Sequence, residues 1–243
     1  MGMVHDPPDL TVHTVSYDHR WGQTFYASLS EDDNTLNGCR TNGADGKMHL
    51  LSILLNHAAK MESPFWKFRH SWDSAAHIIR VVRGPLGKPH LLLGDYRGPA
   101  VSFSYGGGKI WAALRGDGSD IGIDVAAADE FQGKYPVHRV FHDHERHHAM
   151  HLAGGDMEMA SALLWSIKEA VVKALGCAFH LVMPHQVYVY PSMGGAGGHT
   201  FVVFLSKKVL AQPSGCDDQP IWVRSFPLTR MWLSIALLTR QSQ

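Results

Sequence analysis

The spacing of hydrophobic residues along the chain alternates between helical and extended periods. Leu50, Leu51, Leu54, Leu55 and Ala58 recur at helical spacing and predict a helix over residues 48–60. From residue 77 onward, short apolar runs are separated by glycine- and proline-containing turns, which is typical of antiparallel strands. We expect these strands at residues 77–82, 91–93, 100–105, 109–114 and 120–126.

The same order is then repeated in the second part of the chain. Two helices are predicted over residues 141–152 and 156–175, and Gly176 is suited to end the second as a C-terminal cap. Further strands are expected at residues 185–190, 199–205, 221–226 and 231–237. Residues 1–46 are polar and rich in turn formers, with a possible strand at 10–16.

Helix followed by strands, twice over, indicates an α+β fold rather than a parallel βαβ array. We expect two α/β halves, each a small, mainly antiparallel sheet with packed helices, over residues 1–117 and 118–243. The chain length of 243 residues fits this division, since it lies between one and two typical domain lengths.

The strand at 121–126 places different residues on its two faces. Ile121, Ile123 and Val125 share one face, whereas Gly122 and Asp124 share the other. A carboxylate between Ile and Val is poorly placed for a plain surface role. Asp124 is therefore either the partner of a Lys or Arg at the sheet face, or a ligand in a metal or phosphate site.

The helix at 156–175 also has two distinct faces. Its apolar stripe at i, i+3, i+4 and i+7 is the expected core face. Glu169 and Lys173 lie one turn apart on the opposite face, one turn after Trp165. The pair could be a routine surface ion pair, but the Trp suggests that this second face is also covered, by the other half or by a ligand.

Two glycine-rich turns offer cations, hydroxyls and free backbone amides. Residues 83–88 include Arg83 and Lys88, and residues 104–108 begin with Ser104 and Tyr105. Such turns can bind anions, although many are simply hairpin loops.

Composition narrows the choice of function. There are 22 Lys and Arg against 22 Asp and Glu, so a broad basic surface for nucleic acid or an anionic membrane is not expected. The three cysteines are far apart and lack a C-x-x-C pair, which fits a reducing compartment. The first ten residues do not resemble a signal peptide, and the apolar run at 231–238 is too short to span a bilayer. We therefore expect a cytoplasmic protein.

Histidine is abundant, and several of the 17 residues gather between positions 138 and 151. Here His144, Glu145 and His148 match H-E-x-x-H, in which two histidines bind zinc and the Glu acts as a general base. The flanking residues are polar, however, and the more economical interpretation is an exposed polar helix.

Together the motifs resemble a known family. G-I-D-V at 122–125, followed about forty residues later by W-S-I-K-E-A at 165–170 and Lys173, resembles the signature of the Sfp-type 4'-phosphopantetheinyl transferases. Upstream, G-K-P at 87–89 and V-S-F-S-Y-G at 101–106 resemble two further segments of that family, in the expected order. The resemblance covers roughly residues 77–176.

The resemblance implies a fold and a reaction. Members of the family are pseudo-dimers of two similar halves with the active site in the cleft between them. They transfer the phosphopantetheine arm of coenzyme A to a serine of an acyl or peptidyl carrier protein and release adenosine 3',5'-bisphosphate. A chain that contains both halves could form the cleft as a monomer.

The resemblance also implies roles for individual residues. Asp124 and Glu169 would hold Mg²⁺ on the pyrophosphate, Lys173 would stabilise the leaving phosphate, and Glu169, directly or through a metal-bound water, would be the base for the carrier serine. Lys47 is a possible further phosphate contact. The other residues expected to contact coenzyme A are Arg83, Lys88, Ser104, Tyr105 and Lys168.

Two positions depart from the family pattern. Ala126 stands where many members have a second acid, and Tyr105 stands where the family has a histidine, so one charge is missing at each place. Two alternatives to a working transferase therefore stay open. One is a coenzyme A-binding module that no longer transfers, and the other is a zinc metallopeptidase that uses the H-E-x-x-H segment.

Overall fold

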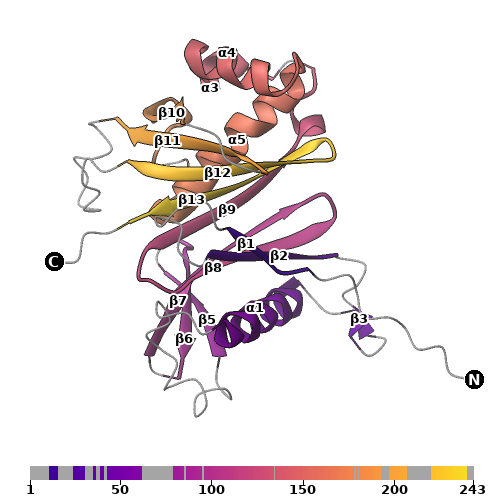
Figure 1. The fold of residues 1–243 in the computed structure, drawn as a ribbon, viewed down its shortest axis with the longest axis vertical. Coiled ribbons are helices and arrows are strands. Elements are labelled where there is room, and N and C mark those ends of the chain that lie inside the picture. The colour runs from indigo at the N-terminus through magenta and orange to yellow at the C-terminus, as the bar shows by residue number, and fades with distance from the viewer. Residues whose placement is uncertain are drawn as a thin grey trace, which may run out of the picture.

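Two large antiparallel sheets, each with its own helical layer, are stacked along the long axis of the described part of the protein (Figure 1). The structure is a computed structural model. The residues that it describes are 11–15, 24–30, 35–36, 39–40, 43–61, 79–84, 86–94, 96–133, 135–177, 179, 181–192, 197–206 and 220–239.

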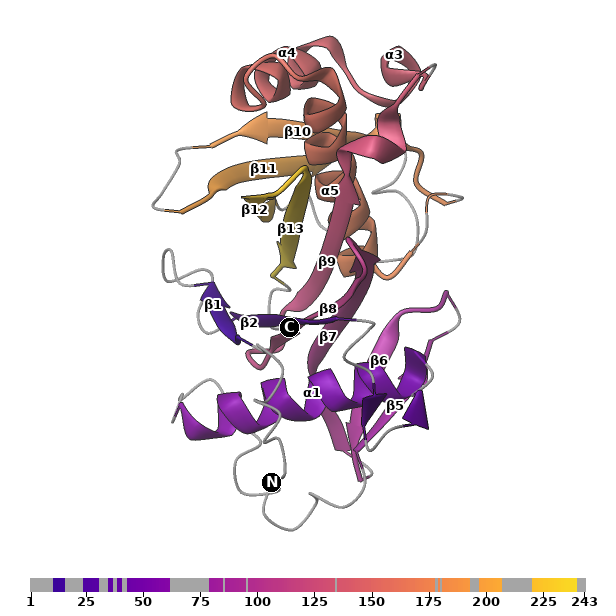
Figure 2. The same ribbon diagram turned by 90° about the vertical axis from the view of Figure 1, so that its right-hand side faces the viewer.

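The N-terminal sheet has the strand order β1-β2-β8-β7-β6-β5, with every neighbouring pair antiparallel. Helix α1 (Gly43–Lys60) covers one face, as Figure 2 shows, and buries Leu50, Leu51, Leu54 and Leu55 against it. The strands are β1 (His13–Val15), β2 (Thr24–Ser30), β5 (Ile79–Arg83), β6 (Pro89–Leu93), β7 (Tyr96–Gly106) and β8 (Lys109–Arg115). A separate short ribbon is formed by β3 (Thr35–Leu36) and β4 (Cys39–Arg40).

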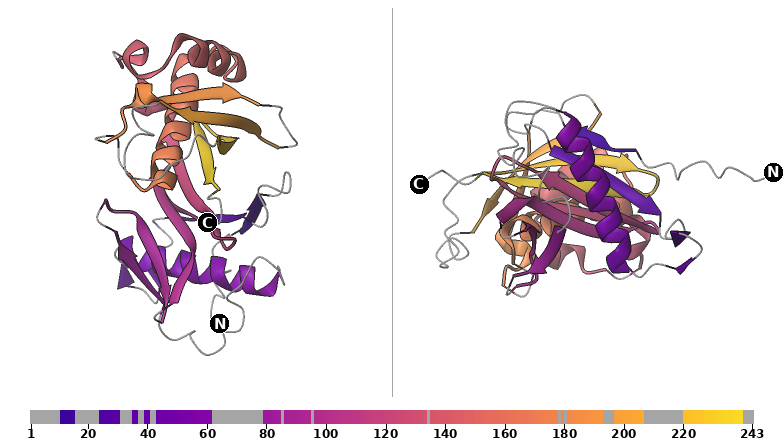
Figure 3. Two further views of the ribbon diagram at one scale, coloured as in Figure 1. Left: turned by 90° about the vertical axis from the view of Figure 1, so that its left-hand side faces the viewer. Right: turned by 90° about the horizontal axis from the view of Figure 1, so that it is seen from below.

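The C-terminal sheet has the order β10-β11-β12-β13-β9 and is also antiparallel. Helix α5 (Met157–Leu175) lies along it, visible from both sides in Figures 2 and 3. The strands are β9 (Asp120–Ala127), β10 (Val187–Pro191), β11 (His199–Leu205), β12 (Ile221–Leu228) and β13 (Met231–Leu238). Short helices surround them: η1 (Ala128–Phe131), α3 (Val137–Val140), α4 (Asp143–Leu152) and η2 (Pro184–Gln186).

Strand β9 joins the two halves through both its side chains and its backbone. Ile121, Ile123 and Val125 point into an apolar cluster shared with β8 and β13. Along the edge of β9, the Ser102 hydroxyl accepts a hydrogen bond from Ile123 N at 3.1 Å, and the Ser104 hydroxyl accepts one from Val125 N at 3.3 Å. Alternate serines on β7 thus satisfy alternate N–H groups of β9, because both follow the two-residue period of extended chains.

Helix α5 approaches the opposite face of β9 at Gly122. A Cβ at this position would stand 1.9 Å from the carbonyl oxygen of Ala170 and 2.7 Å from the nitrogen of Ala174. The two backbones can therefore lie this close only because Gly122 has no side chain.

The predicted α+β architecture with two antiparallel sheets is confirmed. The strands expected from residue 77 onward and the helix at 156–175 form close to their predicted positions. The helix expected at 141–152 is confirmed as α4, which begins at Asp143 because Phe141 and His142 are extended, and a short helix that was not expected, α3, precedes it. Strand β2 was not expected. None of the helices in the described part of the chain combines the length and apolar composition needed to cross a bilayer.

Substituting Gly122→Ala should destabilise the protein. The added methyl group meets helix backbone rather than a flexible side chain, so α5 must move away from β9. We expect a loss of about 3 kcal/mol in the free energy of unfolding, measured by urea denaturation.

Gly108→Ala is the matched control. Gly108 has φ of +67° with open space around its Cβ position, so only backbone strain of about 1–2 kcal/mol is expected. Equal losses for the two variants would contradict the importance of the close approach at Gly122.

Candidate functional site

Helix α5 and strand β9 bring Asp124 and Lys173 into direct contact. The Lys173 ammonium lies 2.7 Å from Asp124 Oδ1 and also donates to the carbonyl oxygen of Ile123 at 3.2 Å. Asp124 is 5% exposed. Lys173 therefore forms its ion pair with Asp124 on β9, at the place where Gly122 lets the helix and the strand approach closely. The spacing of residues along the helix alone also allowed a surface ion pair between Lys173 and Glu169.

Ser104 completes this buried polar cluster. Its hydroxyl lies 2.9 Å from Asp124 Oδ1 and 3.3 Å from the Lys173 ammonium, and accepts from Val125 N. The cluster thus draws on both halves, since Ser104 comes from β7 and its partners from β9 and α5. Ser104, which was expected to contact coenzyme A, is thus a hydrogen-bond partner of Asp124.

Glu169 lies one turn before Lys173 on the same face of α5. Burial raises the pKa of the Glu169 carboxyl, and the nearby negative charge of Asp124 raises it further, while Lys173 opposes the shift. The carboxylate of Glu130 also raises this pKa. A buried carboxylate whose ionisation is disfavoured by a second negative charge lies in a site suited to a cation.

A cavity of about 320 Å³ opens in front of Glu169 and Lys173. Its other wall comes from β5, the β5–β6 turn and β7, so it lies between the two halves. Its lining combines cationic side chains, the carboxylate of Glu169 and several apolar side chains. The lining residues are Lys47, Val81, Arg83, Leu86, Gly87, Lys88, Pro89, Ser102, Phe103, Glu169, Val172, Lys173, Gly176, Cys177 and Phe179.

The predicted residues of the N-terminal half have different positions relative to this cavity. Arg83 lines it and is exposed. Tyr105 is 47% exposed and is not among the lining residues, but the Lys47 ammonium lies 4.7 Å from the centre of its ring and 5.5 Å from that of Phe103. Cation–π contacts of this kind direct Lys47, which does line the cavity, toward β7.

Lys88 lines the cavity but its ammonium contacts the C-terminal half. It lies 2.6 Å from Asp120 Oδ1 and 2.7 Å from the carbonyl oxygen of Ala174. Sequence reasoning missed Asp120, although the signal was present, since Asp120 alternates with Gly122 and Asp124 on one face of the strand.

The structure does not bring Lys168 to the cavity. Its side chain is fully buried, with the ammonium 2.8 Å from Glu145 Oε2 and hydrogen bonds to the carbonyl oxygens of Pro184 and Val187. Burial lowers the pKa of the Lys168 ammonium, and Glu145 opposes that shift. Lys168 therefore holds α5 to α4 and β10 instead of facing the cavity.

Glu145, the acidic residue of the H-E-x-x-H segment, also has all its contacts within the protein. Besides Lys168, its carboxylate accepts from Val189 N and His142 N, each at 2.9 Å. His144 stacks on Tyr190 and His148 packs edge-on against Phe201. Within the described residues, no group of three or more His, Cys, Asp or Glu side chains is placed to hold a metal ion.

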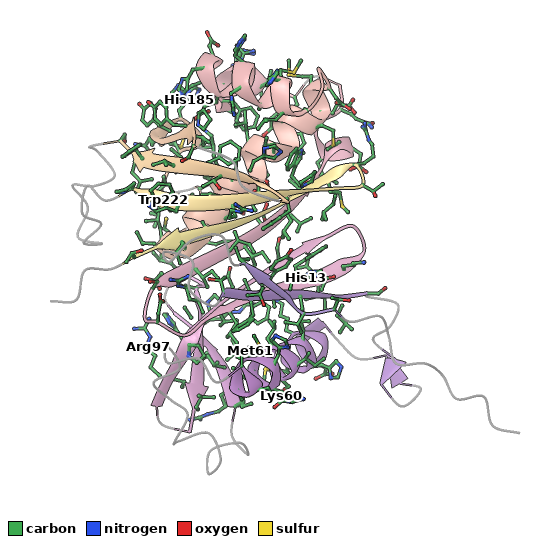
Figure 4. The ribbon with its side chains drawn as sticks, in the orientation of Figure 1. His13, Lys60, Met61, Arg97, His185 and Trp222 are labelled. Carbon is green, nitrogen blue, oxygen red and sulfur yellow. The ribbon has the colours of Figure 1, made fainter. Side chains whose placement is uncertain are left out.

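Helix α4, which carries the H-E-x-x-H segment, contributes no residue to the lining of this cavity. His185, whose carbonyl oxygen contacts the His142 ring, stands in the outer part of the C-terminal half, far from Lys60 and Met61 at the end of α1 (Figure 4). The histidine rings of this segment therefore pack against aromatic side chains. Glu145 is unavailable as a general base, because its carboxylate is bound by Lys168 and by two backbone N–H groups.

Ala126 follows Asp124 on the same side of β9. It is 1% exposed and belongs to the apolar cluster under α5. The second carboxylate that many family members have here is thus replaced by a packing residue.

Residues 120–207 match the model of the 4'-phosphopantetheinyl transferase superfamily. This segment is a domain of that superfamily, and it contains β9, α5 and the contact between Asp124 and Lys173. A comparison with curated proteins finds no match for the chain.

Substituting Lys168→Met should destabilise the protein strongly, because it leaves the Glu145 carboxylate buried without its cation. We expect a loss of about 3–5 kcal/mol in the free energy of unfolding. Urea denaturation measures it, and the double variant Lys168→Met, Glu145→Leu should recover part of the loss.

Arg230→Met is the control for loss of a cation. Arg230 pairs with Asp156 and Glu158 but is 56% exposed, so its removal should change stability far less. A small effect of Lys168→Met combined with weaker binding of coenzyme A would restore Lys168 to the binding site.

Proposed function

We propose that the protein transfers the 4'-phosphopantetheine arm of coenzyme A to a serine of an acyl or peptidyl carrier protein and releases adenosine 3',5'-bisphosphate. One observation carries the proposal: within a domain of the transferase superfamily, α5 presents Glu169 and Lys173 to a cavity between the halves, with Asp124 directly behind Lys173.

The charge of the cavity wall supports a polyphosphate ligand. Lys47, Arg83, Lys88 and Lys173 line the cavity, while the net charge of the whole chain is zero. Lys88 and Lys173 are paired with Asp120 and Asp124, so Lys47 and Arg83 supply the positive charge that is available to a pyrophosphate. The volume of about 320 Å³ is at the lower end of ligand sites, so an elongated ligand such as coenzyme A would extend beyond the cavity. In this proposal residues 1–117 supply most of the phosphate contacts.

The reaction forms a bond between the serine oxygen of the carrier and the phosphorus that bears the pantetheine arm. The bond from that phosphorus to the bridging oxygen of adenosine 3',5'-bisphosphate breaks, and the leaving group takes its electron pair. Glu169 accepts the proton of the serine hydroxyl, and its raised pKa brings it closer to the range of an effective base near neutral pH. Lys173 stabilises the charge on the leaving phosphate.

Asp124 and Glu169 fit a Mg²⁺ site. Both offer hard oxygen ligands, and burial together with the negative charge of Asp124 raises the pKa of Glu169. Mg²⁺ is commonly held by one or two carboxylates together with substrate phosphates and water, so the alanine at position 126 does not exclude it. When bound, the cation would neutralise charge on the phosphates.

The decisive test incubates the purified protein with coenzyme A, Mg²⁺ and a panel of apo carrier proteins. Mass spectrometry should show carriers heavier by one phosphopantetheine group. Asp124→Ala, Glu169→Ala and Lys173→Ala should each lower the rate by about 100-fold or more, because each removes a charged group from the reacting centre.

The variant His144→Ala, His148→Ala is the control and should transfer at the wild-type rate. No mass change with any carrier, while calorimetry still detects coenzyme A, would instead identify a binding module that does not transfer. Stoichiometric zinc that disappears in the double histidine variant would favour a metallopeptidase.

A metal requirement gives a separate prediction. EDTA should abolish transfer and excess Mg²⁺ should restore it, and calorimetry should show tighter binding of coenzyme A when Mg²⁺ is present. Glu169→Gln should raise the Mg²⁺ concentration needed for half-maximal binding of coenzyme A by about tenfold, since it removes one ligand charge. Equal binding with and without Mg²⁺ would contradict the assigned ligands.

A further inference from the structure

One lysine of the N-terminal half contacts two elements of the C-terminal half at the same point. Lys88 precedes β6, Asp120 is the first residue of β9, and Ala174 lies in the last turn of α5. The Lys88 ammonium is 2.6 Å from Asp120 Oδ1 and 2.7 Å from the Ala174 carbonyl oxygen. Lys88 therefore connects the strand that begins the superfamily domain with the end of its central helix.

The ion pair between Lys88 and Asp120 is largely shielded from water. The side chains of Lys88 and Asp120 are 11% and 4% exposed, so removal of one partner would leave the charge of the other buried. The stem of Lys88 is also tightly packed, because a Cβ on Gly176 would stand 2.6 Å from its Cδ atom. The side chain is thus held along its length as well as at its charged end.

The contact with Ala174 has a particular effect on α5. The last four carbonyl groups of a helix have no partner within the helix, and a cation placed there satisfies them and interacts favourably with the helix dipole. Ala174 directly follows Lys173. An ammonium fixed on its carbonyl therefore anchors the turn of α5 that carries the site.

We propose that Asp120 is a positioning residue for phosphopantetheinyl transfer. It holds the Lys88 ammonium on the end of α5 and so fixes Lys173 and Glu169 relative to the phosphate-binding wall of the N-terminal half. This inference rests on the function proposed above. It gives Lys88 a different main role from the phosphate contact that the family resemblance implies.

A double-mutant cycle tests the proposal with Lys88→Met, Asp120→Asn and the double variant. Each single change should lower kcat by about tenfold, because small misplacements of reacting groups are costly, while KM for coenzyme A stays within about twofold. The double variant should be no slower than the slower single variant, since both changes break the same connection. If Lys88→Met does not fold, Asp120→Asn, which keeps the shape of the side chain, still provides the kcat and KM comparison.

Asp117→Asn is the matched control. Asp117 is a nearby, partly exposed aspartate that pairs with Arg115 and does not line the cavity, so kcat should stay at the wild-type value. The proposal is overturned if Lys88→Met raises KM and the dissociation constant of coenzyme A tenfold or more while Asp120→Asn changes nothing. It is also overturned if the two effects multiply in the double variant.

Hydrogen exchange separates failure of this inference from failure of the proposed function. Asp120→Asn should speed exchange of the backbone amides at residues 173–177 by about tenfold relative to the wild type, and Asp117→Asn should not. This measurement needs no carrier protein. A wild type that transfers to no carrier refutes the proposed function, whereas unchanged exchange in Asp120→Asn refutes the positioning role.

Discussion

The close approach of α5 to β9 at Gly122 is the constraint on which the site depends. With helix backbone directly against strand backbone, the Lys173 side chain is long enough to reach both Asp124 and the carbonyl of Ile123. Strand β9 also packs on the N-terminal sheet. The contact at Gly122 therefore sets the position of α5 relative to both sheets. The cavity beside Glu169 follows from that geometry.

The charged side chains of α5 and its neighbours form two groups, one buried inside the C-terminal half and one facing the cavity. Lys168 and Glu145 pair with each other and with nearby backbone groups inside the C-terminal half, where both side chains are fully buried. Lys173 and Glu169 lie on the side of the helix that faces the cavity. The two lysines are five positions apart, which turns them to different sides of a helix with 3.6 residues per turn.

Local patterns predicted most of the secondary structure, and the motifs predicted the centre of the site. Asp124 could be found because an isolated carboxylate in an apolar strand is anomalous, and Glu169 because a Trp beside it marked a covered helix face. The role of Lys168 could not be found, since its partner Glu145 is chosen by tertiary packing. Strand β2 was missed although Phe25 and Leu29 alternate with polar residues, because the segment around it is rich in turn formers.

The two edges of the C-terminal sheet share a property. The hydroxyls of Ser102 and Ser104 occupy the edge of β9, and Glu145 and Lys168 meet the backbone of β10 at Val189 and Val187. Side chains thus take the place that an additional strand would fill. Such an edge cannot readily recruit a strand from another molecule, so the polar residues of these motifs also protect the sheet against aggregation.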